Sequence, residues 1–182
     1  MFAKDEVCWF PMRVTYNREM SVKRELDALG IENFVPMHYE LRENNGARKR
    51  VLVPAIHNLI FVRSTQDMLT ELKNTRRELM PLRYIVRHTL EDGRVEIIVV
   101  PDRQMENFRR VAGVETDDVM FLDCNEYICR VGRRVRIVQG PFAGVEGVIK
   151  RIKNNKHVVV QVEGLAAVAI TFVPPSLLEA VD

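Results

Sequence analysis

Hydrophobic residues alternate with a period of two at the start of the chain, from Val7 to Val14. This alternation predicts a strand with four side chains on one face, namely Cys8, Phe10, Met12 and Val14. Pro11 lies inside the run and has no N–H to donate to a neighbouring strand. The strand is therefore expected at a sheet edge or at a bulge.

The period then changes to that of an amphipathic helix. Val22, Leu26 and Leu29 recur at i, i+4 and i+7, which places them on one helical face. Asn17 is the expected N-cap of this helix, and Gly30 can supply its left-handed end.

Two apolar and aromatic runs follow, and they predict paired strands. They span Phe34 to Leu41 and Leu52 to Arg63, and the polar residues Asn44 to Gly46 are the expected tip of a hairpin. Ser64 with Asp67 three residues later is a capping signature. A second helix is expected from there to about Arg77, with one apolar face made of Met68, Leu69 and Leu72.

The next segment predicts a second hairpin and a third helix. Pro81 precedes an extended run from Leu82 to Leu90, and the turn signal Asp92-Gly93 separates it from Val95 to Val100. Pro101 suits the first turn of a helix that ends at Gly113. The resulting order β-α-β-β-α-β is typical of a ferredoxin-like α+β domain, an antiparallel sheet with helices on one face and the other face free.

After Gly113 the helical and strand periods fade and acidic residues collect. We interpret residues 113–130 as a linker that contains one short strand, Val119 to Leu122. Five β-rich runs follow, and they predict a small SH3-like barrel: Arg134–Val138, Val145–Ile152, His157–Val162, Ala167–Phe172 and Leu177–Val181. The expected domains are therefore residues 1–112 and 131–182, joined by the linker. Within 131–182, seven basic residues outnumber four acidic ones, which gives this segment a net charge of +3. The whole chain has a net charge of +2, so the remaining residues carry −1.

Composition narrows the possible functions. The chain has 182 residues, 47% of them hydrophobic and 29% charged, which suits folded domains. It contains no apolar run long enough to span a bilayer and no secretory signal, so we expect a cytoplasmic protein. Cys124 and Cys129 are spaced C-x4-C, but no second pair of metal ligands follows at a typical spacing. Sequence motifs for nucleotide binding or nucleophilic catalysis are missing as well. We therefore expect no metal, no cofactor and no enzymatic activity.

The segment Val131 to Val162 carries a motif with known relatives. It has a strand, a Gly-Pro-Phe-x-Gly loop and a following basic strand, with Gly140, Gly144 and Gly147 at positions where a small barrel needs sharp corners or close approaches. In these features it resembles the KOW motif of transcription elongation and ribosomal proteins. The motif alone leaves these two classes open.

The first half of the chain distinguishes between them. A first strand led by Trp9, the helix end ELDALGIENFVP, the basic hairpin RKRVLVP and the strand LIFV resemble the N-terminal domain of NusG. In detail the chain is most similar to the UpxY-type antiterminators of Bacteroides, which belong with RfaH in function. Where the family usually has Pro-Leu-Phe-Pro-Gly-Tyr, this chain has the segment Pro54 to Leu59, with aliphatic residues at both aromatic positions.

The resemblance implies a transcription elongation or antitermination factor that binds RNA polymerase and reduces pausing. The implied polymerase-binding residues are Ile56, His57, Leu59, Phe61, Tyr84 and Ile85. Exposure is expected for the first three, which follow a proline, whereas Phe61 and Ile85 could equally fill the core.

The resemblance to RfaH also implies a contact with non-template DNA. Its implied residues are Arg18, Arg76 and Arg77, and the basic hairpin adds Arg48, Lys49 and Arg50. Clustered cations attract phosphates without reading the bases. The plain alternative for each of these residues is a solvated surface position.

The KOW domain of the family recruits a further partner, either Rho or a small-subunit ribosomal protein. The implied contact residues here are Phe142, Ile170 and Phe172, although Phe142 could instead pack across the barrel mouth. The Val and Ile content of residues 157–173 favours strands over the helical form that RfaH adopts. The alternative function is a ribosome-associated RNA-binding KOW protein. We expect a monomer.

Overall fold

The computed structural model describes residues 3–44, 46–88, 95–114, 118–122, 132–152, 155–162, 164–171 and 173–181. The chain forms two compact units that are both discontinuous in sequence. The first combines Met1–Pro36 with Ile56–Asp102, and the second combines Met37–Ala55 with Arg103–Asp182. Within the described ranges, none of the helices has the length and hydropathy needed to cross a bilayer.

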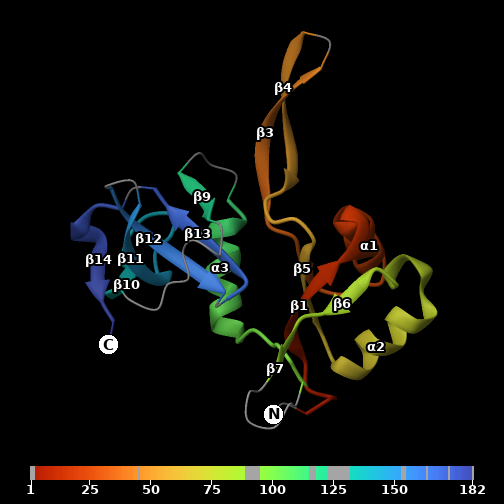
Figure 1. Ribbon diagram of the computed structural model, residues 1–182. Helices are drawn as coiled ribbons and strands as arrows, with labels where there is room; N and C mark the ends of the chain where they lie inside the picture. Colours follow the sequence, from red (N-terminus) through yellow and green to blue (C-terminus); the bar gives the residue numbers. More distant parts are fainter. Residues whose placement is uncertain are drawn as a thin grey trace. The chain divides into compact units, whose positions relative to one another are not determined.

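The first unit is built on a four-stranded antiparallel sheet. Its strand order is β2-β5-β1-β6, with bounds Asn33–Phe34, Leu59–Ser64, Cys8–Val14 and Leu82–Tyr84. The helices α1 (Glu19–Ala28) and α2 (Gln66–Thr75) lie on one side of it (Figure 1). Counted in chain order, β1, β2, β5 and β6 are the first to fourth strands of this sheet, so its spatial order is 4-1-3-2. This is the order of the predicted ferredoxin-like arrangement, which is confirmed.

Alternation along β1 and β5 builds the core beneath the helices. Phe10 lies opposite Val62 and Met12 lies opposite Ile60, so these four side chains share a face. All four are fully buried, as are residues of the helices and of the segment after α2: Val22, Leu26, Leu69 and Leu79. The expected apolar face of the first helix is therefore present.

Pro11 does not mark an edge, and this prediction is wrong. Strand β1 lies inside the sheet, between β5 and β6. Its pairing with β6 covers only Met12 to Val14, so Pro11 lies one residue beyond the last pair. The N–H that proline lacks would point toward the place where β6 has already ended, which is why the sheet tolerates it.

Both predicted helix caps are displaced by one residue. The residue before α1 is Arg18, and Asn17 belongs to a short 3-10 turn, η1 (Thr15–Asn17), with φ of 51°. The residue before α2 is Thr65, whose hydroxyl accepts a hydrogen bond from the Met68 N–H at 3.2 Å. Ser64 is the last residue of β5 instead. Gly30 follows α1 with φ of 68°, as expected for a left-handed helix end.

The remaining elements of the first unit include a short hairpin. Strands β7 (Val86–His88) and β8 (Val95–Ile97) pair as predicted, and the Asp92-Gly93 turn lies outside the described residues. A second 3-10 turn, η2 (Arg77–Leu79), follows α2. The third predicted helix is confirmed as α3 (Asp102–Ala112), which belongs to the second unit from Arg103 onward, and its Met105, Phe108 and Val111 are buried.

The second unit contains a long two-stranded hairpin made by β3 (Met37–Asn44) and β4 (Ala47–Pro54) (Figure 1). The Asn44↔Ala47 pair closes it around Gly46, which has φ of 79°. The predicted strand from Leu52 to Arg63 is therefore wrong as one element, because the chain turns between β4 and β5. Hydrophobicity continues through this turn, so the pattern alone did not reveal the break.

The second unit also contains a six-stranded antiparallel sheet. Its order is β14-β10-β11-β12-β13-β9, with bounds Leu178–Ala180, Arg134–Ile137, Glu146–Ile152, Asn155–Val162, Ala166–Ile170 and Val119–Leu122. A third 3-10 turn, η3 (Pro175–Leu177), precedes β14. The five predicted strands of the KOW segment are confirmed, and the strand expected in the linker is present as β9.

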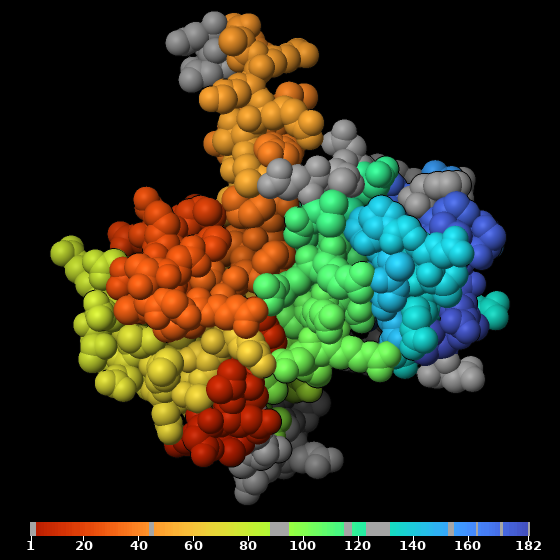
Figure 2. Space-filling model, turned by 180° about the vertical axis from the view of Figure 1, so that it is seen from behind, coloured from red at the N-terminus to blue at the C-terminus, as the bar shows by residue number. Residues whose placement is uncertain are grey.

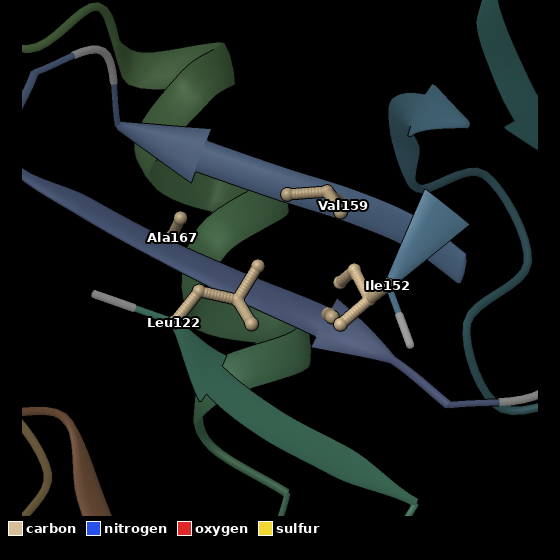
Figure 3. Packing of buried hydrophobic residues seen from close by; sticks show 5 residues of the cluster. Leu122, Ile152, Val159 and Ala167 are labelled. Carbon is tan, nitrogen blue, oxygen red and sulfur yellow. The ribbon is translucent and has the colours of Figure 1, made fainter. Parts of the chain in front are cut away.

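Strand β9 belongs to the same sheet as the barrel strands and completes part of its core. It pairs with β13 from Ala167↔Leu122 to Ile170↔Val119. Figure 3 shows its Leu122 side chain together with Ile152, Val159 and Ala167 of three barrel strands, and Ala169 belongs to the same buried cluster. The segment expected to be a linker therefore supplies a core residue to this sheet.

Candidate functional site

A row of apolar side chains crosses the first sheet on the face away from α2. Phe61 of β5 lies opposite both Pro11 of β1 and Phe34 of β2, so the three share one face. Ile85 continues the row, because it follows the Met12↔Tyr84 pair by one residue and so comes opposite Pro11. Phe61 and Pro11 are buried, whereas Phe34 and Ile85 at the two ends are half-buried. The face expected to be free is thus closed at its centre and accessible at its ends.

The turn between β4 and β5 is fixed by a buried carboxylate. Glu19, the first residue of α1, accepts a hydrogen bond from the Asn58 N–H at 2.5 Å, and it is buried. The Asn58 carbonyl in turn accepts from the Val14 N–H at 3.0 Å, and Asn58 itself has φ of 60°. These bonds fix both backbone polar groups of Asn58, the last residue before β5, and Ile56 and His57 come just before it in the turn. His57 is exposed and Ile56 is half-buried.

Three exposed arginines lie along one flank of α1. Arg18 and Glu25 are seven residues apart, so they lie on the same flank, two turns or about 10 Å apart. Glu25 forms an ion pair with Arg76 at 3.8 Å, which places the segment after α2 beside this flank. Arg77 follows as the first residue of η2. The structure therefore brings Arg18, Arg76 and Arg77 to one side of the unit.

The basic residues of the long hairpin divide between its two faces. The register places Arg48 and Arg50 on the face of Tyr39 and Leu41, and Lys49 on the other face opposite Arg42. The Arg50 guanidinium lies 4.7 Å from the centre of the Tyr39 ring. Leu41 is 71% exposed. One hairpin face thus combines cations with exposed apolar groups, which the sequence reading did not foresee.

The glycine loop of the KOW segment has the expected backbone requirements. Gly140 and Gly144 have φ of 88° and 84°, in the left-handed region that favours glycine. At Gly147, a Cβ would lie 2.7 Å from the Val159 carbonyl oxygen of the adjacent strand, so only glycine lets the two backbones approach this closely. Phe142 lies in the loop and is half-buried.

A charged cluster joins α3 to the barrel within the second unit. Glu146 of β11 has a side chain only 10% exposed and accepts hydrogen bonds from Arg136 at 2.7 Å and from Arg103 of α3. The hydrogen bond from Arg136 is the main reason that the pKa of Glu146 is lowered, and the charge of Arg103 adds to it. Arg110, also on α3, donates to the Ala143 carbonyl at 2.6 Å. In Figure 2, α3 (green) lies against the cyan strands of this unit.

Comparison with known proteins identifies the chain. The family model described as "Transcription termination factor nusG" matches residues 7–109, more than half of its length. The chain belongs to the NusG family. A KOW motif model matches residues 131–163, as the glycine loop predicts for a NusG protein. NusG proteins are transcription factors. The two matched segments, the NusG domain and the KOW motif, are consistent with a role in elongation or antitermination.

The solved structures include a NusG protein of similar length. It is described as "Domain interaction in Thermotoga maritima NusG", with 19% sequence identity and a TM-score of 0.43. The alignment covers 99% of this chain and 100% of that chain. No curated protein shows a significant match.

The residues that the NusG resemblance implied for polymerase binding do not share one face. Tyr84 points to the helix side of the sheet, where its hydroxyl bonds Thr70 at 3.0 Å and Lys73 lies 4.3 Å from its ring centre. Burial raises the pKa of Tyr84 and lowers that of Lys73. Leu59 is only 5% exposed, so its expected exposure is wrong. Phe61 is fully buried, in agreement with the core alternative.

In the KOW segment, the structure favours one of the three implied contact residues of this NusG protein. Ile170 is buried, and its strand β13 lies inside the sheet between β12 and β9. Phe172 lies outside the described residues. Phe142 is therefore the implied contact residue that the described structure leaves partly accessible.

Groups of metal ligands are missing from the described part of this NusG chain. Cys124 and Cys129, the spaced pair, lie outside that part. Cys8 is a free thiol whose pKa is raised mainly by burial, so it is a poor thiolate ligand or nucleophile.

Proposed function

We propose that this chain binds RNA polymerase through its first unit and reduces pausing or termination during elongation. Membership of the NusG family over residues 7–109 is the observation that carries the proposal. A factor of this kind makes and breaks no bond. It acts by binding one conformation of the polymerase more tightly than another, and it shifts the equilibrium by that difference in affinity.

The polymerase contact is best assigned to the accessible ends of the apolar row and to the turn beside it. Ile85 and Phe34 are half-buried at the two ends, and Ile56 and His57 come just before Asn58, whose N–H donates to Glu19. Phe61 and Leu59 support this surface from below. Tyr84 is left out of the surface, because it packs against α2 on the opposite face.

Nucleic acid is the second partner that we propose. Arg18, Arg76 and Arg77 lie on one flank of the first unit, where they could bind phosphates of the non-template strand. Arg48, Lys49 and Arg50 on the hairpin are a separate basic group with the same chemistry.

The barrel is proposed to recruit a further protein, Rho or a small-subunit ribosomal protein, through the loop that carries Phe142. The proposal is supported by the KOW match and by the partial exposure of this ring between two left-handed glycines. The UpxY-type specialisation remains a prediction that rests on the sequence motifs.

Binding to purified core RNA polymerase from the host tests the main proposal. The double variant Ile56→Asp with Ile85→Asp is expected to bind at least tenfold more weakly, because it places charges in an apolar contact. Met68→Asp is the matched control, since Met68 is 52% exposed on α2 and lies outside the proposed surface. Thermal unfolding checks that all variants are folded. Equal binding by wild type and the double variant would refute the assignment.

A further inference from the structure

Tyr16 is a large aromatic side chain that the fold does not use. It is 84% exposed and lies in the 3-10 turn between β1 and α1. Its backbone has φ of 64°, and the next residue, Asn17, has φ of 51°. The Arg18 guanidinium lies 5.9 Å from the centre of the Tyr16 ring. None of the residues implied by the sequence for nucleic-acid contact was aromatic.

The combination of these features is unusual, although an exposed aromatic residue is ordinary by itself. A bulky side chain at positive φ is a genuine outlier, because glycine or asparagine would hold the same backbone at a lower cost. Backbone strain of this kind concentrates at functional sites. Here the strained turn presents the ring to solvent, where it contributes nothing to the core.

The ring stands at one end of the arginine-lined flank of α1. Arg18 is two residues from it, and Arg76 and Arg77 lie about two helical turns further along the same flank. Glu25 offsets one of these charges through its pair with Arg76, and the exposed Glu78 follows Arg77 in η2. A strand of nucleic acid that follows this flank would meet cations along its backbone and an aromatic face at its end.

We propose that Tyr16 is a stacking platform for an unpaired nucleobase, and that Arg18, Arg76 and Arg77 bind phosphates of the same strand. This deepens the nucleic-acid contact of the proposed function and rests on that part of it. Stacking uses the flat face that every base has, so binding tolerates different sequences. The bases of a duplex are already stacked on each other, so the site favours single strands.

Fluorescence anisotropy with the full chain tests the stacking role. The probes are an oligothymidylate and an oligouridylate of about 12 nucleotides, within the usual site size, and a DNA duplex of equal length. Tyr16→Asn removes the ring but keeps a residue that accepts positive φ, so the turn still forms. We expect it to bind the single strands about tenfold more weakly than wild type. Tyr16→Phe keeps the ring and is expected to bind like wild type.

The salt dependence separates stacking from phosphate binding. Tyr16→Asn is expected to leave the slope of log K against log salt concentration unchanged. The double variant Arg76→Ala, Arg77→Ala is expected to make this slope shallower by the amount that corresponds to one to two lost phosphate contacts. The two single-stranded probes show whether DNA or RNA is the better ligand. Equal affinity of wild type and Tyr16→Asn for both single strands, or tighter binding of the duplex, would overturn the proposal. The assay contains no polymerase, so its failure leaves the polymerase test of the proposed function standing.

Discussion

Single hydroxyl groups at the end of β5 show how finely the chain selects its helix start. Ser64 and Thr65 are adjacent, and either could cap a helix on sequence grounds. The strand decides between them, because β5 pairs through Cys8↔Ser64 and so keeps Ser64 extended and buried. Thr65 is the first residue free to turn, and its hydroxyl reaches the Met68 N–H.

Replacing these two residues separately should give different losses of stability. Thr65→Ala removes the cap and is expected to lower the free energy of unfolding by about 1 kcal/mol. Ser64→Ala is expected to cost less than about 0.5 kcal/mol, because the Ser64 hydroxyl is buried without a hydrogen-bond partner among the described residues. Urea unfolding followed by circular dichroism measures both. A larger loss of stability in Ser64→Ala than in Thr65→Ala would show that Ser64 caps the helix, as the sequence suggested.

Among the elements, the helices and strands that periodicity defines were predictable, whereas the register between paired strands was not. The apolar spacing of Val22 and Leu26 gave α1, and the short Val-rich runs gave the barrel strands. The side of the sheet that Tyr84 occupies depends on the register of β6 with β1, which no local pattern contains. The exposure of Tyr16 is likewise set by backbone angles, and its sequence neighbours carry no signal for it.

The contact between α3 and the barrel is an arrangement of elements that also escaped the sequence. Arg103, Asn107 and Arg110 recur at i, i+4 and i+7, which reads as an ordinary solvated helix face. In the structure Asn107 accepts a hydrogen bond from the Glu146 N–H, and the two arginines hold the Glu146 carboxylate and the Ala143 carbonyl. A polar face thus binds a partner element through donors and acceptors, which hydrophobic patterning cannot detect.

This contact should make stability depend on pH in the acidic range. The folded pKa of Glu146 lies below its ordinary value, so its ionised form contributes stability that is fully present above its unfolded pKa. That contribution is lost as the pH falls through the folded pKa. At pH 7, Glu146→Gln is expected to lower the free energy of unfolding by about 1 kcal/mol, and the difference from wild type should vanish toward pH 2.

Urea unfolding between pH 2 and pH 7 measures this difference. Glu179→Gln is the control, because Glu179 is an exposed acid that lies opposite Arg136 on β14. It is expected to change the free energy of unfolding by less than about 0.5 kcal/mol at any pH. A Glu146→Gln curve that runs parallel to wild type over the whole range would show that the ion pairs contribute nothing.

At the scale of the whole molecule, the two units do not follow the order of the chain. The expected barrel domain of residues 131–182 contains the KOW match, but α3 and β9 make their described contacts with it from earlier positions. Strand β9 covers the edge of β13, and its Leu122 is buried against barrel residues. A small barrel has little core of its own, so one added strand matters to its stability.

Fragments of different length should reveal this dependence. The fragment 131–182 is expected to unfold with a free energy at least about 2 kcal/mol lower than 101–182, because it lacks Leu122 and exposes the edge of β13. The fragment 114–182 keeps β9 without α3, so it separates the contribution of the strand from that of the helix. Circular dichroism during urea unfolding measures all three, and each spectrum should be dominated by strands. If 131–182 were as stable as 101–182, then β9 and α3 would contribute nothing to the stability of the barrel.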